Sequence, residues 1–159
     1  MIEASELHGD FVLSSGRRSA VYFDKFLFLT DPALLDELSI EVARKVPPGV
    51  DRLGAPEGAA MLLVSAVALK TGLPISVVRK EPKAYGTMSQ IEGGGVEGSK
   101  IALIEDVATT GHQVERAARA LKEAGAAIEV IILAIDRGGG VHLREAGYRV
   151  EPVAVMETD

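Results

Sequence analysis

The sequence predicts an α/β fold, with a mainly parallel sheet covered by helices on both faces. Short runs of apolar residues alternate with segments whose apolar residues recur at helical spacing, and this alternation is typical of parallel sheets. Proline or glycine marks most changes from one kind of segment to the other. The chain, residues 1–159, contains neither an internal repeat nor a linker, so we expect one domain with a sizeable core.

The first part of the chain is expected to be extended and then helical. Residues 9–29 combine scattered aromatic and aliphatic residues with a turn around Gly16. Asp31 and Pro32 then form a strong helix start, because aspartate caps the first N–H groups and proline favours the first helical position. The segment 47–49, Pro-Pro-Gly, ends this helix.

The middle of the chain predicts a strand, a helix, a second strand and a long loop. A short strand near Leu53 leads through a glycine-containing turn to an apolar helix, which ends at about Thr71 because Gly72 can adopt the left-handed conformation. Residues 75–78 form the next strand. Residues 79–98 are polar and rich in glycine, and a loop of this length in a compact domain is usually functional, so we expect a mobile lid.

The second half of the chain repeats the alternation with longer apolar runs. Val114, Ala117, Ala118 and Leu121 fall on one face of a predicted helix. The predicted elements are a buried strand at 100–106, a helix at 112–124 closed by Gly125, a buried strand at 128–135, a short helix at 141–146 and a last strand at 148–155.

Composition narrows the class of protein. A net charge of −6 disfavours a general nucleic-acid binder but allows a small phosphorylated ligand, and the lack of cysteine excludes disulfides and thiolate chemistry. Zinc is not expected, because His8, His112 and His142 show no ligand spacing. No apolar run approaches the roughly 20 residues that span a bilayer. The acidic N-terminus does not resemble a secretory signal, so we expect a cytoplasmic protein that does not bind membranes.

Residues 101–112 are the most informative segment. Four apolar residues predict a buried strand, and Glu105 and Asp106 follow where it should end, at the sheet edge where ligands bind. The turn 108–111 is small, rich in hydroxyl groups and followed by a helix, so its N–H groups and the helix dipole can bind phosphate. The two acids would repel phosphate. They must therefore face another part of the ligand, for which a sugar diol or a metal ion is suitable.

This arrangement resembles the loop that binds 5-phosphoribosyl-1-pyrophosphate (PRPP) in the type I phosphoribosyltransferases. By this resemblance, Glu105 and Asp106 hold the ribose hydroxyls. The family more often has small residues where this chain has His112 and Gln113. The resemblance assigns the 5-phosphate to the turn, through Ala108, Thr109, Thr110, Gly111 and His112.

A cationic cluster begins the predicted lid. Arg79, Lys80 and Lys83 lie within five residues, which suits a pyrophosphate leaving group because its charge grows in the transition state. The pattern Arg-Lys-Glu-x-Lys-x-Tyr-Gly resembles the catalytic lid of the orotate-using branch of this family, which reaches the active site of the neighbouring subunit. The resemblance implies that Arg79, Lys80, Lys83 and Tyr85 contact pyrophosphate or stabilise its departure. Tyr85 stands where the family often has histidine.

The N-terminal segment, about residues 1–29, is similar to the hood that covers the base in this family. By this resemblance, Tyr22 and Phe23 lie over the orotate ring. Some members have a functional lysine where this chain has Ser14, and Lys25 is close enough to substitute for it. The family usually has a longer helix before the hood, so part of the hood or of the dimer surface is expected to differ here.

Two further segments match the family pattern. Arg137 follows a predicted strand, and in the orotate-using branch the arginine of an Asp-Arg-x-x-Gly segment binds the carboxylate of orotate. A guanidinium suits a planar carboxylate because it can form two parallel hydrogen bonds. Residues 54–59 correspond to the pyrophosphate loop, whose glycines bring backbone N–H groups close to the ligand. Glu57 is a departure, because a carboxylate beside a polyanion is unfavourable.

The resemblance covers about residues 9–155 and implies transfer of the phosphoribosyl group from PRPP to orotate, giving orotidine 5′-monophosphate and pyrophosphate. It also implies a homodimer, Mg²⁺ held mainly by substrate oxygens, and a dissociative mechanism that needs positioning and charge stabilisation more than a strong base. Two alternatives stay open: a phosphoribosyltransferase for another nucleobase, and a non-catalytic sensor of PRPP.

Overall fold

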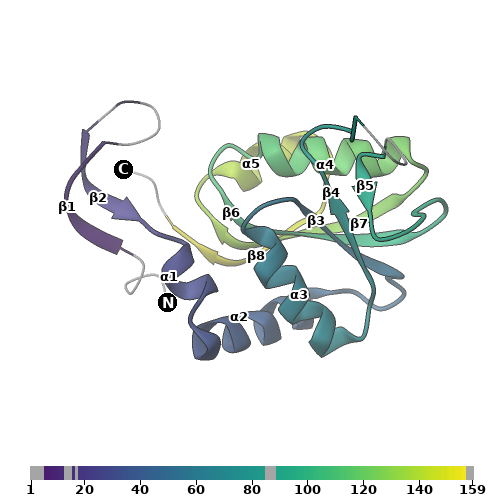
Figure 1. Ribbon diagram of the computed structural model, residues 1–159, viewed down its shortest axis with the longest axis horizontal. Helices are drawn as coiled ribbons and strands as arrows, with labels where there is room; N and C mark the ends of the chain where they lie inside the picture. The colour runs from purple at the N-terminus through teal and green to yellow at the C-terminus, as the bar shows by residue number, and fades with distance from the viewer. Residues whose placement is uncertain (1–5, 13–15, 17, 85–88, 157–159) are drawn as a thin grey trace.

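The computed structural model describes residues 6–12, 16, 18–84 and 89–156, most of which form one layered α/β body (Figure 1). The central sheet contains six strands, in the spatial order β5 (Ile91–Glu92), β4 (Ile75–Val78), β3 (Arg52–Pro56), β6 (Lys100–Ala108), β7 (Ala127–Asp136) and β8 (Val150–Val155). Neighbouring strands are parallel, except that β5 runs antiparallel to β4. The predicted fold class is therefore confirmed.

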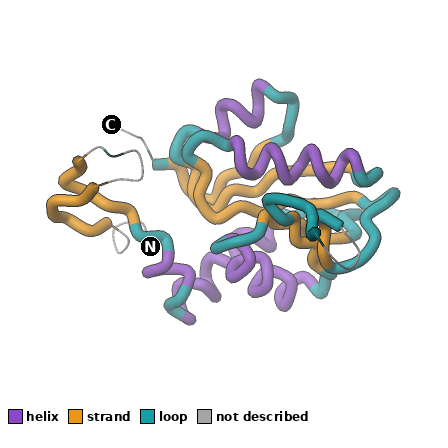
Figure 2. The backbone as a smooth tube through the Cα atoms, turned by 45° about the horizontal axis from the view of Figure 1, so that its top comes forward, coloured by secondary structure: helices purple, strands orange, loops and turns teal. Residues whose placement is uncertain are grey.

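Helices cover both faces of the sheet (Figure 2). The covering helices are α2 (Pro32–Lys45), α3 (Ala60–Thr71), α4 (His112–Glu123) and α5 (Gly139–Glu145). The first two pack on one face and the last two on the other, so there are two cores. Among the described residues, no helix has the length and the apolar character needed to cross a membrane.

Strand β6 shows why the sheet needs both layers. Ala102 and Ile104 belong to the core beneath α2 and α3, whereas Ile101 and Leu103 belong to the core beneath α4. Successive side chains of a strand point to opposite faces of the sheet. The unbroken apolar run in the sequence is therefore what a strand buried on both faces requires.

The predicted order of strands and helices is confirmed, with small differences in their bounds. The carboxylate of Asp31 accepts hydrogen bonds from the N–H groups of Ala33 and Leu34, both at 3.0 Å, and so caps α2. Gly72 ends α3 with φ of 72°. Strand β6 continues to Ala108 because its pairing with β7 continues that far, so the acidic pair lies within the strand.

Two segments differ from the prediction. Within 79–98, residues Ile91–Glu92 form β5 because the edge of β4 supplies hydrogen-bond partners for them, so this segment is not a loop throughout. Residues Phe26–Leu29 form the short helix α1 where an extended chain was predicted. The side chain of Asp24 accepts a hydrogen bond from the N–H of Phe26 at 2.9 Å, which favours a helical turn there.

The N-terminal hairpin lies apart from the main sheet. Strands β1 (Glu6–Val12) and β2 (Arg18–Phe23) pair antiparallel and project to the left in Figure 1, and α1 connects them to α2. A two-stranded sheet is only marginally stable by itself in water. The hairpin therefore depends on contacts beyond its own two strands.

The carboxyl ends of β3, β6 and β7 lie at one edge of the sheet, where ligands bind in open α/β folds. Ala108, the last residue of β6, is the register partner of Asp136, the last residue of β7. The N–H of Arg137 donates to the carbonyl of Ala108 at 2.8 Å. The fold therefore brings the segments around residues 106 and 137 together.

The close approach of α5 to the turn before α4 gives a testable prediction. A Cβ on Gly139 would lie 2.7 Å from the backbone nitrogen of Gly111 and 2.9 Å from the Cβ of Ala108. We expect Gly139→Ala to lower the free energy of unfolding by about 1–3 kcal/mol, because backbone atoms cannot move aside cheaply. Urea unfolding measures this change. Gly95→Ala is the matched control, because a Cβ there meets nothing within 4 Å and neither glycine has a positive φ. Equal losses in the two variants would contradict the prediction.

Candidate active site

Two buried carboxylates lie near the carboxyl end of β6. Glu105 and Asp106 expose only 4% and 1% of their surfaces. The backbone N–H of Asp106 donates to Oε1 of Glu105 at 3.2 Å. Oδ2 of Asp106 lies 2.9 Å from Nζ of Lys25, which follows the N-terminal hairpin. The hairpin and the central strand therefore meet at this ion pair.

The pair of acids carries a proton at neutral pH. Burial is the largest cause that raises the pKa of Glu105 from 4.5 to about 9, and the hydrogen bond and negative charge of Asp106 add to it. The positive charge of Lys25 acts in the opposite direction and is weaker. Lys25 balances the one negative charge that remains.

The turn after β6 opens α4. Gly111 precedes the helix with φ of 78°, and Thr109 and Thr110 are exposed. The first N–H groups of a helix have no partner within the helix, so together with the two hydroxyl groups they are suited to bind phosphate, and the predicted phosphate role of this turn stays a prediction. A cavity combines this turn with the buried acids. Its lining residues are Lys25, Glu105, Asp106, Val107, Ala108, Thr109, Thr110, Gly111, Gln113 and Val114.

Arg137 lies beside this turn, to which its backbone N–H is bonded through Ala108. Its guanidinium lies over the ring of Phe23, with Cζ 5.2 Å from the ring centroid. Nε of Arg137 is buried and makes no hydrogen bond with any described residue. A buried donor without an acceptor is costly, so this group is suited to an acceptor on a ligand.

The two aromatic residues predicted to cover the base face opposite sides of β2, because strand side chains alternate. The ring of Phe23 lies 6.1 Å from that of Phe28 and also contacts Arg137. Tyr22 pairs with Phe11, at 5.5 Å between ring centroids, and is 41% exposed. The structure therefore brings Phe23 to Arg137, while the place of Tyr22 over the base stays a prediction.

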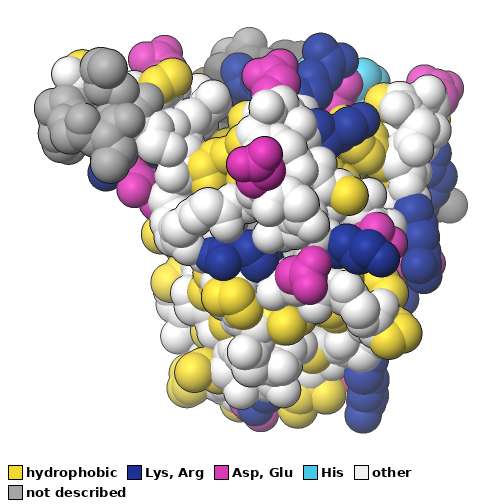
Figure 3. All heavy atoms as spheres, turned by 90° about the vertical axis from the view of Figure 1, so that its right-hand side faces the viewer, with side chains coloured by type: hydrophobic (Ala, Val, Ile, Leu, Met, Phe, Trp, Pro, Cys, Tyr) yellow, Lys and Arg dark blue, Asp and Glu magenta, His cyan; other side chains and the backbone are white. Residues whose placement is uncertain are grey.

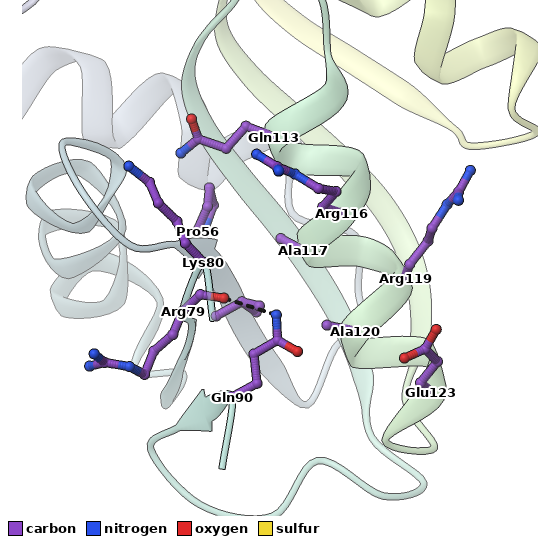
Figure 4. A pocket seen from close by; sticks show the side chains of 11 residues that line it. Pro56, Arg79, Lys80, Gln90, Gln113, Arg116, Ala117, Arg119, Ala120 and Glu123 are labelled. Carbon is purple, nitrogen blue, oxygen red and sulfur yellow. Dashed lines mark hydrogen bonds between the residues drawn. The ribbon is translucent and has the colours of Figure 1, made fainter. Parts of the chain in front are cut away.

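A second cavity lies between the end of β4 and α4 (Figure 4). Gln113 lines both cavities, so they are neighbours. The side chain of Lys80 points toward Gln113, whereas the guanidinium of Arg79 points away from it (Figure 4). The carbonyl of Arg79 accepts a hydrogen bond from Nε2 of Gln90 at 3.0 Å. The lining residues are Pro56, Val78, Arg79, Lys80, Gln90, Gln113, Arg116, Ala117, Arg119, Ala120 and Glu123.

Glu57 connects the loop 54–59 to the start of the predicted lid. Its Oε1 accepts a hydrogen bond from the N–H of Lys80 at 2.7 Å, and its own N–H donates to the carbonyl of Val78 at 2.8 Å. The carboxylate that departs from the family pattern therefore holds the backbone of Lys80.

The other predicted lid residues are not brought to the cavities. Nζ of Lys83 lies 2.6 Å from Oε1 of Glu92, and its N–H donates to the carbonyl of Ser89 at 3.3 Å. Lys83 lines neither cavity. Tyr85 lies outside the described residues. The catalytic roles expected for Lys83 and Tyr85 stay predictions.

Two further residues lie at or near the site: Gln113, which the sequence marked only as a departure from the family pattern, and Glu115, which no motif indicated. Gln113 is the second residue of α4. It closely follows the turn 108–111, which could have indicated that it lies near the site. Oε2 of Glu115 lies 4.0 Å from Nδ1 of His112 and 2.6 Å from Nε2 of His142. Hydrogen bonds from His142 and Arg119 lower the pKa of Glu115.

The spacing of the histidines was a poor guide to their arrangement. Residues three apart on a helix are neighbours, so the pair His112 and Glu115 could have been found from the sequence. The contact of His142 with Glu115 could not have been found from the sequence, because the two residues lie 27 positions apart and meet only where α5 packs on α4. The histidines show no ligand spacing along the chain, yet the fold brings His112 and His142 together beside Glu115.

Comparison with known proteins agrees with this geometry. A family model described as the phosphoribosyl transferase domain matches residues 33–153, which run from α2 into β8. The match includes the acidic pair, the phosphate turn and Arg137. The chain therefore belongs to the phosphoribosyltransferase family.

Curated relatives identify the branch of this family. An orotate phosphoribosyltransferase of Nocardioides sp. is 44% identical, over 92% of this chain and 83% of the relative. One from Thermococcus gammatolerans is also 44% identical, over 92% of this chain and 80% of the relative. The crystal structure of orotate phosphoribosyltransferase from Aeropyrum pernix matches 96% of this chain and 88% of its own, with a TM-score of 0.78 and 31% identity. The branch is that of the orotate phosphoribosyltransferases.

The raised pKa of Glu105 predicts how stability depends on pH. Between pH 4.5 and about 9 the folded chain keeps a proton that the unfolded chain has lost, so stability falls as pH rises through this window. Glu105→Gln does not titrate. The free energy of unfolding of Glu105→Gln minus that of the wild type should therefore rise by roughly 1 kcal/mol for each pH unit within the window.

Urea unfolding at a series of pH values within that window measures the difference. Glu37→Gln, which changes an exposed carboxylate on α2, is the control. A difference between Glu105→Gln and the wild type that does not change with pH would contradict the prediction.

Proposed function

We propose that this protein transfers the 5-phosphoribosyl group of PRPP to orotate, which gives orotidine 5′-monophosphate and pyrophosphate in pyrimidine biosynthesis. The observation that carries the proposal is the cavity at the carboxyl end of β6, where the buried pair Glu105 and Asp106 and the opening of α4 face one space. The names of the relatives support orotate as the acceptor. The cytoplasmic location expected from the sequence stays a prediction.

The charges around this cavity suit the phosphoribosyl part of PRPP. The turn 108–111 and the first N–H groups of α4 bind the 5-phosphate, which is kept from the acids by repulsion. Ribose hydroxyls both donate and accept hydrogen bonds. They therefore match a pair of acids in which Asp106 accepts and the protonated Glu105 donates. Lys25 must release or share Asp106 when the diol binds.

The cations of the lid serve the leaving group. Arg79 and Lys80 line the cavity next to the ribose site. Pyrophosphate gains charge as the bond to C1 breaks, so cations near it lower the barrier. Lys83 has to leave Glu92 to take part. That exchange leaves the buried Oε1 of Glu92 without a partner, so the contact of Lys83 with pyrophosphate has to compensate for the lost ion pair.

Arg137 is suited to recognise the acceptor. Phe23 covers one face of its guanidinium and limits its movement, which leaves the edge of the group for a planar carboxylate. The hydrogen bond from its N–H to Ala108 fixes the base site relative to the phosphate turn. Orotate has the ring and the carboxylate that these two side chains require.

The proposed reaction is dissociative. The bond between C1 and pyrophosphate breaks, pyrophosphate leaves with the electron pair, and positive charge develops on the sugar. N1 of orotate then attacks C1 from the opposite face, and the N1 proton is released to water or to a pyrophosphate oxygen. The protein supplies position and charge more than a strong base, and Asp106 lies where a negative charge stabilises the positive sugar.

Magnesium is the cofactor that we propose, and the donor groups fit an ion carried by the substrate. Glu105 holds a proton and Lys25 pairs with Asp106, so little negative charge is left to bind Mg²⁺ from the protein alone. Mg²⁺ prefers oxygen ligands and keeps several waters. Pyrophosphate and ribose oxygens would supply most ligands, with Asp106 on the protein side. When bound, the ion neutralises charge on the leaving pyrophosphate.

We also propose a homodimer in which the lid of one subunit serves the site of the other. Figure 3 shows many apolar side chains exposed in its lower half, at the level of α2 and α3, with some charged side chains among and around them. Exposed apolar surface of this kind favours contact with another protein, and a second copy would cover it. The exposed apolar residues of α1 and α3 are Phe26, Leu27, Met61, Leu62 and Leu69.

The dimer gives a prediction that light scattering after size-exclusion chromatography can check. Met61→Glu places a charge in the apolar surface of α3 and should shift the protein to a monomer. Val141→Glu, at an exposed position on α5, should leave the dimer intact. A monomeric wild type, or a dimeric Met61→Glu variant, would argue against this interface.

The function itself is tested by the loss of orotate absorbance when the protein is mixed with orotate, PRPP and Mg²⁺. We expect consumption that requires both PRPP and Mg²⁺. If orotate is not consumed but calorimetry shows PRPP binding, a sensor is favoured. If another nucleobase is consumed instead, the acceptor has been assigned wrongly.

Arg137→Ala should raise the KM for orotate by about ten- to a hundredfold, because the variant loses two charge-assisted hydrogen bonds to the carboxylate. The binding of PRPP should not change. Steady-state kinetics with each substrate varied in turn measures the effect. Arg144→Ala is the control. Arg144 is a partly exposed cation on α5 whose Nη1 lies 3.9 Å from Oδ2 of Asp136. An unchanged KM for orotate in Arg137→Ala would remove Arg137 from the base site.

Lys83→Ala should lower kcat by about 10²–10³-fold, as removal of a group that stabilises transition-state charge does, with little change in PRPP affinity. Turnover and PRPP calorimetry together separate the two effects. The surface ion-pair variant Lys70→Ala controls for the loss of a cation elsewhere. Parallel losses of turnover and PRPP binding would contradict a role confined to the lid.

A further inference from the structure

Two histidines and a glutamate meet on α4 and α5, outside both cavities. The candidate ligand atoms of His112, Glu115 and His142 all lie within 4.8 Å of one another. Oε2 of Glu115 is 2.6 Å from Nε2 of His142 and 4.0 Å from Nδ1 of His112. The two imidazole rings meet edge to face, with their centroids 4.5 Å apart.

The backbone holds these side chains together from two helices. His112 and Glu115 are one turn apart on α4 and face the same side, and His142 comes from the neighbouring α5. The starts of the two helices are in backbone contact, since a Cβ on Gly111 would lie 2.7 Å from the carbonyl oxygen of Gly139. Only glycine at both positions allows this approach.

Glu115 is oriented to use one oxygen toward the histidines. Its side chain is 9% exposed, and Oε1 is bound by Arg119 at 2.5 Å. Oε2 is therefore the oxygen directed to the imidazoles. A partner that holds the other atom of a ligating group in this way is typical of metal sites.

We propose that His112, Glu115 and His142 bind one Zn²⁺ ion. Two imidazoles and a carboxylate form a zinc ligand set that leaves a fourth tetrahedral position for water. Zinc at about 2.0–2.2 Å from each ligand needs ligand atoms roughly 3.3 Å apart. Oε2 of Glu115 lies 2.6 Å from His142 and 4.0 Å from His112, on either side of this spacing, and both imidazoles are at least partly exposed.

The ion would join α4 to α5. It would take the place of the hydrogen bond between His142 and Glu115, so that one hydrogen bond is exchanged for metal–ligand bonds. The ligands come together only in the folded chain. Zinc therefore stabilises the folded state, and this effect does not depend on the proposed enzymatic activity.

The test uses the full chain after removal of metals with a chelator. Calorimetry with Zn²⁺ measures stoichiometry and affinity, and visible absorption with Co²⁺ reports the geometry of the site. His142→Gln removes one ligand, and His8→Gln is the matched control because His8 is exposed on β1. We expect one Zn²⁺ per chain in the wild type and in His8→Gln, and an affinity lower by at least about tenfold in His142→Gln. Excess Mg²⁺ should not compete, because it prefers oxygen ligands.

Thermal unfolding gives a second readout. Zn²⁺ should raise the Tm of the wild type and of His8→Gln, but not that of His142→Gln. If His142→Gln does not fold, His112→Gln gives the same comparison, because that side chain is 66% exposed. Equal Zn²⁺ affinity in the ligand and control variants, or a wild type that binds no Zn²⁺, would overturn the proposal.

Discussion

The pairing of β6 with β3 on one side and β7 on the other determines where the whole candidate site lies. The apolar residues 101–104 need cover from both helical layers, so the strand occupies the middle of the sheet and its carboxyl end is buried with it. Burial of two adjacent carboxylates is costly unless their charge is compensated. Here a proton on Glu105 and the ammonium group of Lys25 provide the compensation. The electrostatics of the site therefore follow from the position of one strand.

Much of the fold could be predicted from the sequence, because its signals are local. Asp31 before Pro32, Gly72 at a helix end and the apolar run 101–104 each act through neighbouring residues. The two elements that were missed, α1 and β5, have only four and two residues. A strand of two residues leaves no periodic signal and forms where a distant part of the chain supplies partners, whereas α1 is a single turn that Asp24 caps locally. Strand β5, for example, depends on its pairing with β4 and on Arg52, which donates to the carbonyl of Gly93.

The candidate site also has features that could be predicted from the sequence and features that could not. The acids and the phosphate turn could be predicted because they are contiguous, and a buried strand followed by a helix places them at the sheet edge. Contacts between distant segments could not be predicted. The position of Arg137 over Phe23 and that of His142 beside Glu115 leave no signal in the spacing of residues along the chain. Lys25 was expected near the base, and the structure pairs it with Asp106.

The ion pair between Lys25 and Asp106 couples two parts of the molecule that would otherwise act separately. Lys25 immediately precedes α1, next to the N-terminal hairpin, while Asp106 belongs to the central strand. A ligand that occupies Asp106 competes with Lys25 and so shifts the equilibrium of the hairpin. By thermodynamic reciprocity, anything that holds the hairpin in another position changes the affinity of the strand for that ligand by the same free energy. Binding at the central strand and the position of the hairpin are therefore linked through this single ion pair.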